Sequence, residues 1–460
     1  MVNAEDCLWG DEFFDIYMKH ASKKSYNNEE LHFSAALALI GQSIRNVRLR
    51  TDQNFTDPRI HPFVIQSSGT GKNSTFNFMS TVADAAKMSF EEHGKDSTAG
   101  IMGTVDQSGE QKYGDLKGSG FVAWKEAQQL VKASQADHSS DLLEVINQAL
   151  DPSGKVSRSL SQGDLEYSSR TSMFATTYPP KPGNSVDLIH QGFLPRTLFI
   201  YRRWDQDQYT EINKMRDDKL PRPGESNESY IDEFNDDVQK LANTLNYIED
   251  TVWEFGEVRR GEESFFAQGQ EHIEYFEGVE DGVSIDPTPM VEEAMQDYSY
   301  KVRDIARPFT TRLFDMVYKL SACFAAVDVQ KAENNPELKK DCYVSRVIKQ
   351  QHVDDAKRII ERSWRFILNF IKDYMVDVAD SPVLETEQTI KEICRNDSDM
   401  ASVREIMVET GQSKKQVQQE VATLQEMGKI KTLNSTAHAL DPEDKVTVDD
   451  ETQIWRTSNE

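Results

Sequence analysis

The residue whose sequence surroundings most clearly indicate a chemical role is a lysine that follows a glycine-rich turn. The turn at 68–71 and Lys72 follow an apolar run at 63–65 and precede a stretch with apolar side chains at helical spacing. The glycines allow backbone N–H groups to close around phosphate oxygens, the helix N-terminus adds its dipole, and the lysine reaches the terminal phosphates. The order strand, turn, helix favours a phosphate-binding loop over an ordinary turn with an exposed lysine.

The loop departs from the usual pattern G-x-x-x-x-G-K-[ST] at two positions. Gln66 stands where the first glycine is expected, and Asn73 stands where a hydroxyl normally touches magnesium, with Ser74 one place later. An amide oxygen can ligate a hard cation, so we expect Asn73 and Ser74 to lie at a Mg²⁺ site beside bound ATP. The residues expected to contact the nucleotide are Ser68, Gly69, Thr70, Gly71, Lys72, Asn73 and Ser74.

A second apolar run, at 121–124, ends in a charged pair. Lys125 and Glu126 stand where ATPases with such a loop usually carry Asp-Glu. Glu126 can orient the attacking water, whereas a lysine cannot fill the metal-binding role of the aspartate. The alternative is a strand that ends at a solvated ion pair.

The next two predicted elements are a strand that ends in hydroxyl side chains and a hairpin that carries basic side chains. The run at 171–177 ends in Thr176 and Thr177, and either hydroxyl could sense the γ-phosphate, although threonines are common at strand ends. The preceding alternation of polarity predicts a hairpin that carries Lys155 and Arg158.

An arginine precedes the next strand. Arg196 stands just ahead of the apolar run 197–201. Such an arginine is either structural or reaches a neighbouring subunit's nucleotide as an arginine finger.

These stretches resemble, in order and separation, the AAA+ ATPases of the minichromosome maintenance helicase type. SSGTGKNS, GDLKGSGFVAWKEA, the hairpin at 155–167, FATTYPP and GFLPRTLFI correspond to the family's loop, Walker B block, presensor hairpin, sensor strand and arginine-finger block. The layout also resembles primase-helicase-type ATPases of phages and plasmids. The resemblance covers residues 30–375 and departs from the helicase pattern at Gln66, Asn73, Lys125 and Thr176.

The resemblance implies an α/β phosphate-loop core with a helical lid. It also implies that Arg196 acts in trans within a homo-oligomeric ring, a hexamer, and that Arg312 on a lid helix touches the γ-phosphate; a surface arginine in a first helical turn is the alternative. Lys155 and Arg158 would then grip DNA in the pore. The family's N-terminal DNA-binding and zinc domain has no counterpart in the sequence, so we expect the protein either to load on DNA differently or to use a loader or replication partner.

Changes in pattern along the chain predict five segments. The segment at 216–307 is acidic and less regular, with helices expected near 228–248 and 263–277 around a strand at 251–258. The segments are a helical lead-in at 1–57, an AAA+ core at 58–215, an acidic linker at 216–307, a helical lid at 308–378 and a winged helix at 383–460.

The winged-helix prediction depends on three short amphipathic stretches followed by two strand-like ones, 429–433 and 453–456. A helix-turn-helix places its last helix in the DNA major groove. Lys414 and Lys415 at the start of that helix supply positive charge for DNA contact, and docking of a protein partner is equally compatible.

Composition limits the other possibilities. The net charge of −26 argues against nonspecific nucleic-acid binding over the whole surface and would suit a salt-rich cytoplasm. The four cysteines are widely spaced, and the nine histidines form no metal-ligand pattern, which indicates reduced thiols and no zinc. No apolar run has the ~20 residues needed to cross a membrane, and the expected location is the cytoplasm.

The main prediction is an ATP-hydrolysing motor acting on DNA, similar to a replicative helicase of a virus, plasmid or other mobile element. The alternative is a nucleotide-dependent initiator or switch that binds DNA without processive unwinding, which the departures at Asn73 and Lys125 favour. A structural protein with a degenerate loop is a third possibility.

Overall fold

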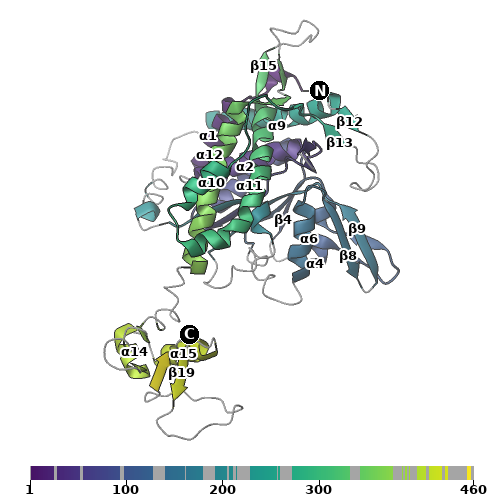
Figure 1. Ribbon diagram of the computed structural model, residues 1–460. Helices are drawn as coiled ribbons and strands as arrows, with labels where there is room; N and C mark the ends of the chain where they lie inside the picture. Colours follow the sequence, from purple (N-terminus) through teal and green to yellow (C-terminus); the bar gives the residue numbers. More distant parts are fainter. Residues whose placement is uncertain are drawn as a thin grey trace. The chain divides into compact units, whose positions relative to one another are not determined.

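The chain divides into two compact units, Met1–Ile371 and Lys372–Glu460 (Figure 1). The segments expected as lead-in, core and linker, and most of the expected lid, all belong to the first unit. The computed structural model describes residues 2–24, 28–51, 55–93, 98–127, 140–160, 162–179, 192–204, 207–210, 214, 228–255, 257–259, 272–331, 342–344, 346–376, 386, 389–390, 393, 401–410, 414–426, 430–433 and 453–456.

A five-stranded parallel sheet forms the centre of the first unit, in the order β11-β3-β10-β7-β4. The three inner strands are buried along their whole length, as expected for apolar runs covered on both faces. This confirms the prediction of an α/β fold and of strands at the predicted apolar runs. The strands are β3 (Pro62–Gln66), β4 (Phe90–His93), β7 (Phe121–Trp124), β10 (Ser172–Thr177) and β11 (Leu198–Arg202).

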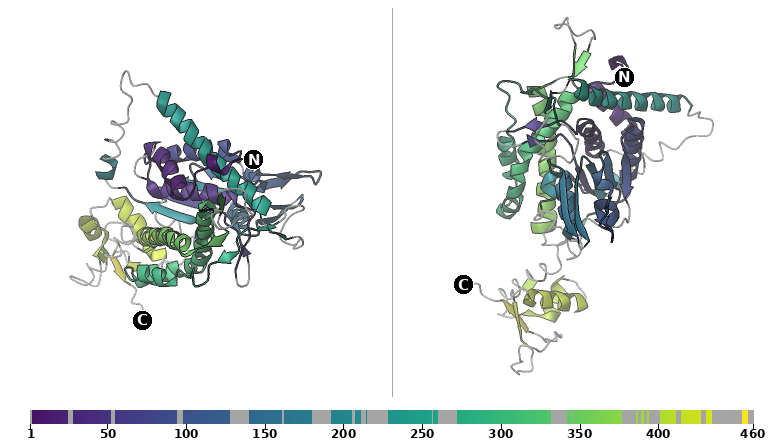
Figure 2. Two further views of the ribbon diagram at one scale, coloured as in Figure 1. Left: turned by 90° about the horizontal axis from the view of Figure 1, so that it is seen from above. Right: turned by 90° about the vertical axis from the view of Figure 1, so that its right-hand side faces the viewer.

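Four helices pack together beside the sheet (Figure 2). They are α1 (Asp11–Lys24), α2 (Glu29–Ser43), α3 (Lys72–Ala85) and α9 (Glu228–Phe255). The helix expected near 228–248 is present but continues to Phe255, so the strand expected at 251–258 is wrong apart from β12 (Glu257–Arg259). Leu245, Ile248 and Val252 recur at helical spacing and are buried, and this packing keeps the segment helical. Of the helix expected at 263–277, residues 263–271 lie outside the described part and 272–274 form strand β13.

A second helical group covers the β11 edge. It contains α10 (Thr288–Met295), α11 (Tyr300–Val327) and α12 (Gln350–Ile371). Ser363 Oγ of α12 donates to Phe199 O of β11 at 2.8 Å. The lid helix expected from 308 begins at Tyr300, where the Ser299 side chain caps it, and Pro308 lies inside it. Arg312 therefore lies in the body of a long helix and not in its first turn.

Two antiparallel hairpins lie beside each other in the first unit. β8 (Lys155–Leu160) and β9 (Gly163–Ser168) confirm the hairpin predicted at 155–167. The second, β5 (Gly103–Val105) with β6 (Gln111–Tyr113), was not predicted. The Tyr113 and Tyr167 rings meet edge to face with centroids 5.9 Å apart. Helices α4 (Thr98–Met102) and α6 (Ser140–Leu150) flank these hairpins.

The remaining elements of the first unit are short. They are η1 (Ala4–Asp6), β1 (Leu49–Arg50), β2 (Phe55–Thr56), η2 (Asp115–Lys117), η3 (Leu194–Arg196), β13 (His272–Glu274), β14 (Gly278–Val279), β15 (Val329–Lys331), β16 (Cys342–Val344) and β17 (Val347–Ile348). Among the helices that the structure describes, none has the length and apolar character to span a membrane.

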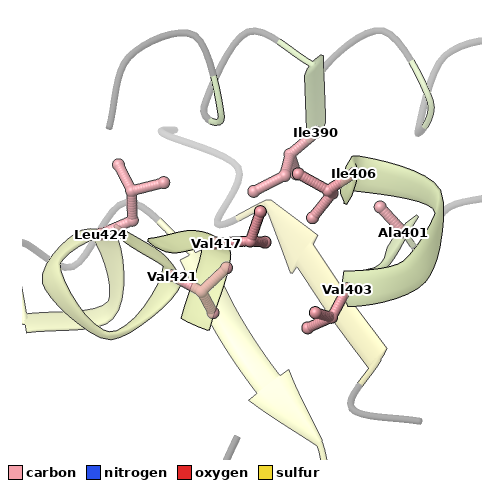
Figure 3. Close-up of a cluster of buried hydrophobic side chains, with 7 residues drawn as sticks. All are labelled: Ile390, Ala401, Val403, Ile406, Val417, Val421 and Leu424. Carbon is pink, nitrogen blue, oxygen red and sulfur yellow. The ribbon is translucent and has the colours of Figure 1, made fainter. Parts of the chain in front are cut away.

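The described part of the second unit includes helices α14 and α15 and a three-stranded antiparallel sheet in the order β18-β20-β19. Ser402 and Glu405 bond each other's backbone N–H reciprocally, a capping box that fixes the start of α14. Buried aliphatic side chains from the three amphipathic stretches of the sequence form one core (Figure 3). The elements are η5 (Lys372–Val376), β18 (Ala401–Ser402), α14 (Val403–Thr410), α15 (Lys414–Glu426), β19 (Ile430–Leu433) and β20 (Gln453–Arg456).

Candidate functional site

The strand order places the carboxyl ends of β3 and β10 next to each other. The chain leaves β3 toward β4 at one edge of the sheet and leaves β10 toward β11 at the other edge. Neighbouring parallel strands whose connections leave in opposite directions form a topological switch point, where ligands bind in open α/β sheets. The glycine-rich turn follows β3 at this point, so the fold supports the sequence prediction of where a ligand would lie.

The backbone of the turn explains its glycines. Gly69 and Gly71 have φ values of +78° and +86°, in the left-handed region that side chains with a Cβ rarely adopt. Gly71 is the N-cap of α3, a 14-residue helix, and has no side chain that could cover its first N–H groups. These groups and the helix dipole provide a setting for an anion.

Lys72 is the first residue of α3, and its side chain is buried at the carboxyl ends of two strands. Its Nζ donates to Gln66 O of β3 at 3.0 Å and to Thr177 O of β10 at 3.4 Å. Burial lowers the pKa of this ammonium from its ordinary 10.5 to about 8, and the negative charge of Glu126 opposes the change. A buried cation whose hydrogen bonds go to neutral carbonyls is well suited to receive an anionic ligand.

A residue that the sequence analysis missed holds the turn in place. Asn28 is buried just ahead of α2, and its Nδ2 donates to Gln66 Oε1 at 3.0 Å and to Thr70 O at 3.2 Å. The departure from glycine at Gln66 thus has a structural role, because the Gln66 side chain anchors the turn to the N-terminal helices. A polar residue before a helix normally indicates an N-cap, so nothing in the sequence suggested this contact; Asn28 makes no side-chain cap bond.

The two residues of the predicted charged pair, Lys125 and Glu126, contact different partners. Lys125 Nζ lies 2.6 Å from Glu92 Oε2 of the edge strand β4, which directs this ammonium away from the turn. Glu126 is exposed and accepts a hydrogen bond from the Tyr178 hydroxyl at 3.1 Å. Since Lys72 is also within electrostatic range of Glu126, the glutamate belongs to the same site as the turn.

The two candidate threonines differ in their partners. Thr176 Oγ1 donates to Lys125 O at 2.7 Å and so ties β10 to the end of β7. Thr177 Oγ1 is fully buried and has no hydrogen-bond partner among the residues that the structure describes. Buried hydroxyls normally find partners. Thr177 is therefore the better candidate for a polar contact with a ligand.

The residues predicted to bind magnesium lie on the first turn of α3. Asn73 is exposed and Ser74 is half-buried. Within the described part of the chain, no group of three or more His, Cys, Asp or Glu side chains is placed to hold a metal ion. The side chains of Asn73 and Ser74 fit a cation whose other ligands are water and phosphate oxygens.

The two candidate arginines lie near the amino-terminal ends of the strands, whereas the turn follows the carboxyl end of β3. Arg196 in η3 directly precedes β11, whose first residue pairs with Pro62 at the start of β3. Its Nη2 lies 3.8 Å from Asp151 Oδ2, and burial followed by the charge of Arg312 lowers its pKa. The structure therefore groups Arg196 with Arg312, and neither reaches Lys72 of the same chain.

The predicted DNA-binding residues are surface residues of separate elements. Lys155 is exposed at the base of the β8–β9 hairpin, opposite Ser168, and Arg158 is half-buried midway along it. Lys414 and Lys415 are exposed in the first turn of α15 in the second unit.

Comparison of the chain with known protein families and with curated proteins finds no match. The site is therefore interpreted from its own geometry.

Proposed function

We propose that this chain binds ATP at the turn after β3 and hydrolyses it as an AAA+ motor acting on DNA. One observation carries the proposal. Four features lie together at the carboxyl ends of β3, β10 and β7. They are a glycine turn, a buried lysine, a buried threonine hydroxyl and a glutamate. Three strands that are distant in sequence supply side chains suited to one phosphate group.

Each side chain has a role that its position supports. The turn N–H groups and Lys72 bind the β- and γ-phosphates, and Thr177 contacts the γ-phosphate through its free hydroxyl. Glu126 orients the attacking water. Asn73 and Ser74 hold Mg²⁺, which when bound neutralises charge on the phosphate oxygens.

The opposite placement of the arginines favours a ring. In a ring, the surface of one subunit that carries Arg196 and Arg312 faces the surface of its neighbour that carries Lys72. A trans arginine stabilises negative charge on the phosphates only when a neighbour is docked. The proposed assembly is a hexamer, and it acts with a loader or replication partner.

The DNA contacts are assigned to the hairpin and to the second unit. Lys155 and Arg158 on the hairpin bind the DNA backbone in the ring's pore. The described order β18, α14, α15, β19 and β20 supports a winged helix, with α15 as the helix that carries Lys414 and Lys415. Such a motor fits the replication machinery of a virus, plasmid or other mobile element, working in the cytoplasm.

A second candidate is a nucleotide-dependent initiator or switch. The Lys125–Glu92 ion pair favours it, because this position offers no carboxylate to the metal. Such a protein would bind ATP and DNA but turn over slowly and without stimulation.

The test is ATP turnover by the purified protein in high potassium chloride, with and without single-stranded DNA. The motor predicts turnover that DNA raises and that Lys72→Ala and Arg196→Ala each abolish; Arg307→Ala, an exposed arginine on α11, is the matched control. Nucleotide binding with no DNA-stimulated turnover would favour the initiator.

A further inference from the structure

Tyr178 follows β10 directly and contacts both charged groups of the candidate site. Its hydroxyl donates to Glu126 Oε1 at 3.1 Å, and its ring centroid lies 3.7 Å from Lys72 Nζ. One half-exposed side chain thus joins the lysine and the glutamate.

The phenol lies where a terminal phosphate would have to lie. If Lys72 binds that phosphate and Glu126 orients the water that attacks it, the phosphate must sit between them. An ammonium over a partly exposed aromatic ring is attracted only weakly. A phosphate anion at the same ammonium forms charge-assisted hydrogen bonds, which are roughly twice as strong as neutral ones. The phosphate is therefore able to displace the ring.

We propose that Tyr178 is a positioning residue that holds Lys72 and Glu126 in their ligand-free arrangement and is displaced by the terminal phosphate of the nucleotide. Its departure frees Glu126 to orient water, so the glutamate becomes available only when a phosphate is present. This inference rests on the proposed nucleotide site.

The displacement is tested with 3-fluorotyrosine at position 178, observed by ¹⁹F NMR while tripolyphosphate and then ATP with Mg²⁺ are added. Calorimetry on the same samples measures binding. We expect the resonance to shift in proportion to occupancy and to stay unchanged in Lys72→Ala. Binding without any shift of the ¹⁹F resonance would overturn the role of Tyr178 but not the proposed nucleotide site. Absence of binding would overturn both.

The cost of displacing Tyr178 is tested with Tyr178→Phe, which keeps the ring over Lys72 and removes only the hydroxyl. Because ATP then binds without breaking the hydrogen bond to Glu126, we expect its Kd to fall about three- to tenfold, the range for one hydrogen bond of ordinary strength. The change falls on Kd because Tyr178 has already left when the bound nucleotide reacts. Tyr178→Ala also removes the ring over Lys72 and lowers Kd further. Tyr209→Phe is the matched control, because that hydroxyl contacts Ser68 O. An unchanged or higher Kd for Tyr178→Phe would contradict the proposal.

Discussion

Replacing Lys72 with methionine is expected to make the ligand-free protein more stable near neutral pH. The lysine's pKa falls from 10.5 to about 8 because its ammonium is buried. Since one pKa unit corresponds to about 1.36 kcal/mol, the charged lysine destabilises the folded state by about 3 kcal/mol. Methionine fills a similar volume without charge but leaves the Gln66 and Thr177 carbonyls without their donor, which costs about 1–2 kcal/mol. The net gain is about 1–2 kcal/mol at pH 7.

The sign of the pH dependence follows from the depressed pKa. Below pH 8 the lysine is protonated in both the folded and the unfolded state, so the full penalty is present. As the pH rises from 8 to 10.5 the folded protein releases its proton first, and the wild type gains stability relative to Lys72→Met. The stability of the wild type relative to the variant should therefore rise by about 3 kcal/mol across this range, so that the wild type becomes the more stable protein at high pH.

The assay is urea unfolding followed by tryptophan fluorescence, at pH 7 and at pH 10, without nucleotide. Lys125→Met is the matched control, because its ion pair with Glu92 is partly exposed and exposed pairs contribute about 0–1 kcal/mol. A stability difference between wild type and Lys72→Met that does not change with pH would refute the reasoning that burial destabilises the charge.

Three further predictions concern ligand contacts. Asn28→Ala should weaken ATP binding about tenfold by releasing the turn, measured by calorimetry, with exposed Asn77→Ala as control. Thr177→Val should lower kcat about tenfold with little change in KM, because its hydroxyl has no role in the fold; a larger effect on stability than on kcat would contradict this. Mixing Lys72→Ala with Arg196→Ala subunits should restore part of the turnover, because mixed neighbours recreate intact sites; activity no higher than in either variant alone would exclude a trans arginine.

The sequence predicted those parts of the fold that local pattern determines. Fully apolar runs such as 63–65 and 121–124 became buried parallel strands, and alternation around 155–167 became a hairpin. The predicted strand at 251–258 failed because α9, which packs against α1, α2 and α3, continues to Phe255 with Val252 buried. A β-branched run near a helix end has no local feature that reveals such packing.

Individual residues of the site could be predicted from the sequence, but the contacts between their side chains could not. The turn and Lys72 follow from residue types, whereas the link from Asn28 to Gln66 and the phenol of Tyr178 between Lys72 and Glu126 depend on strands brought together by the fold. Likewise, the sequence left Thr176 and Thr177 equivalent, and only their partners in the sheet separate them.

The central claim is that the turn ending in Lys72 binds a nucleoside triphosphate. Calorimetric titration of wild type and Lys72→Ala with ATP and Mg²⁺ tests it most directly. We predict one site per chain in the wild type and affinity at least about a hundredfold weaker in the variant, equivalent to about 2.8 kcal/mol. Equal affinity in the two proteins, or no binding by the wild type, would contradict the account.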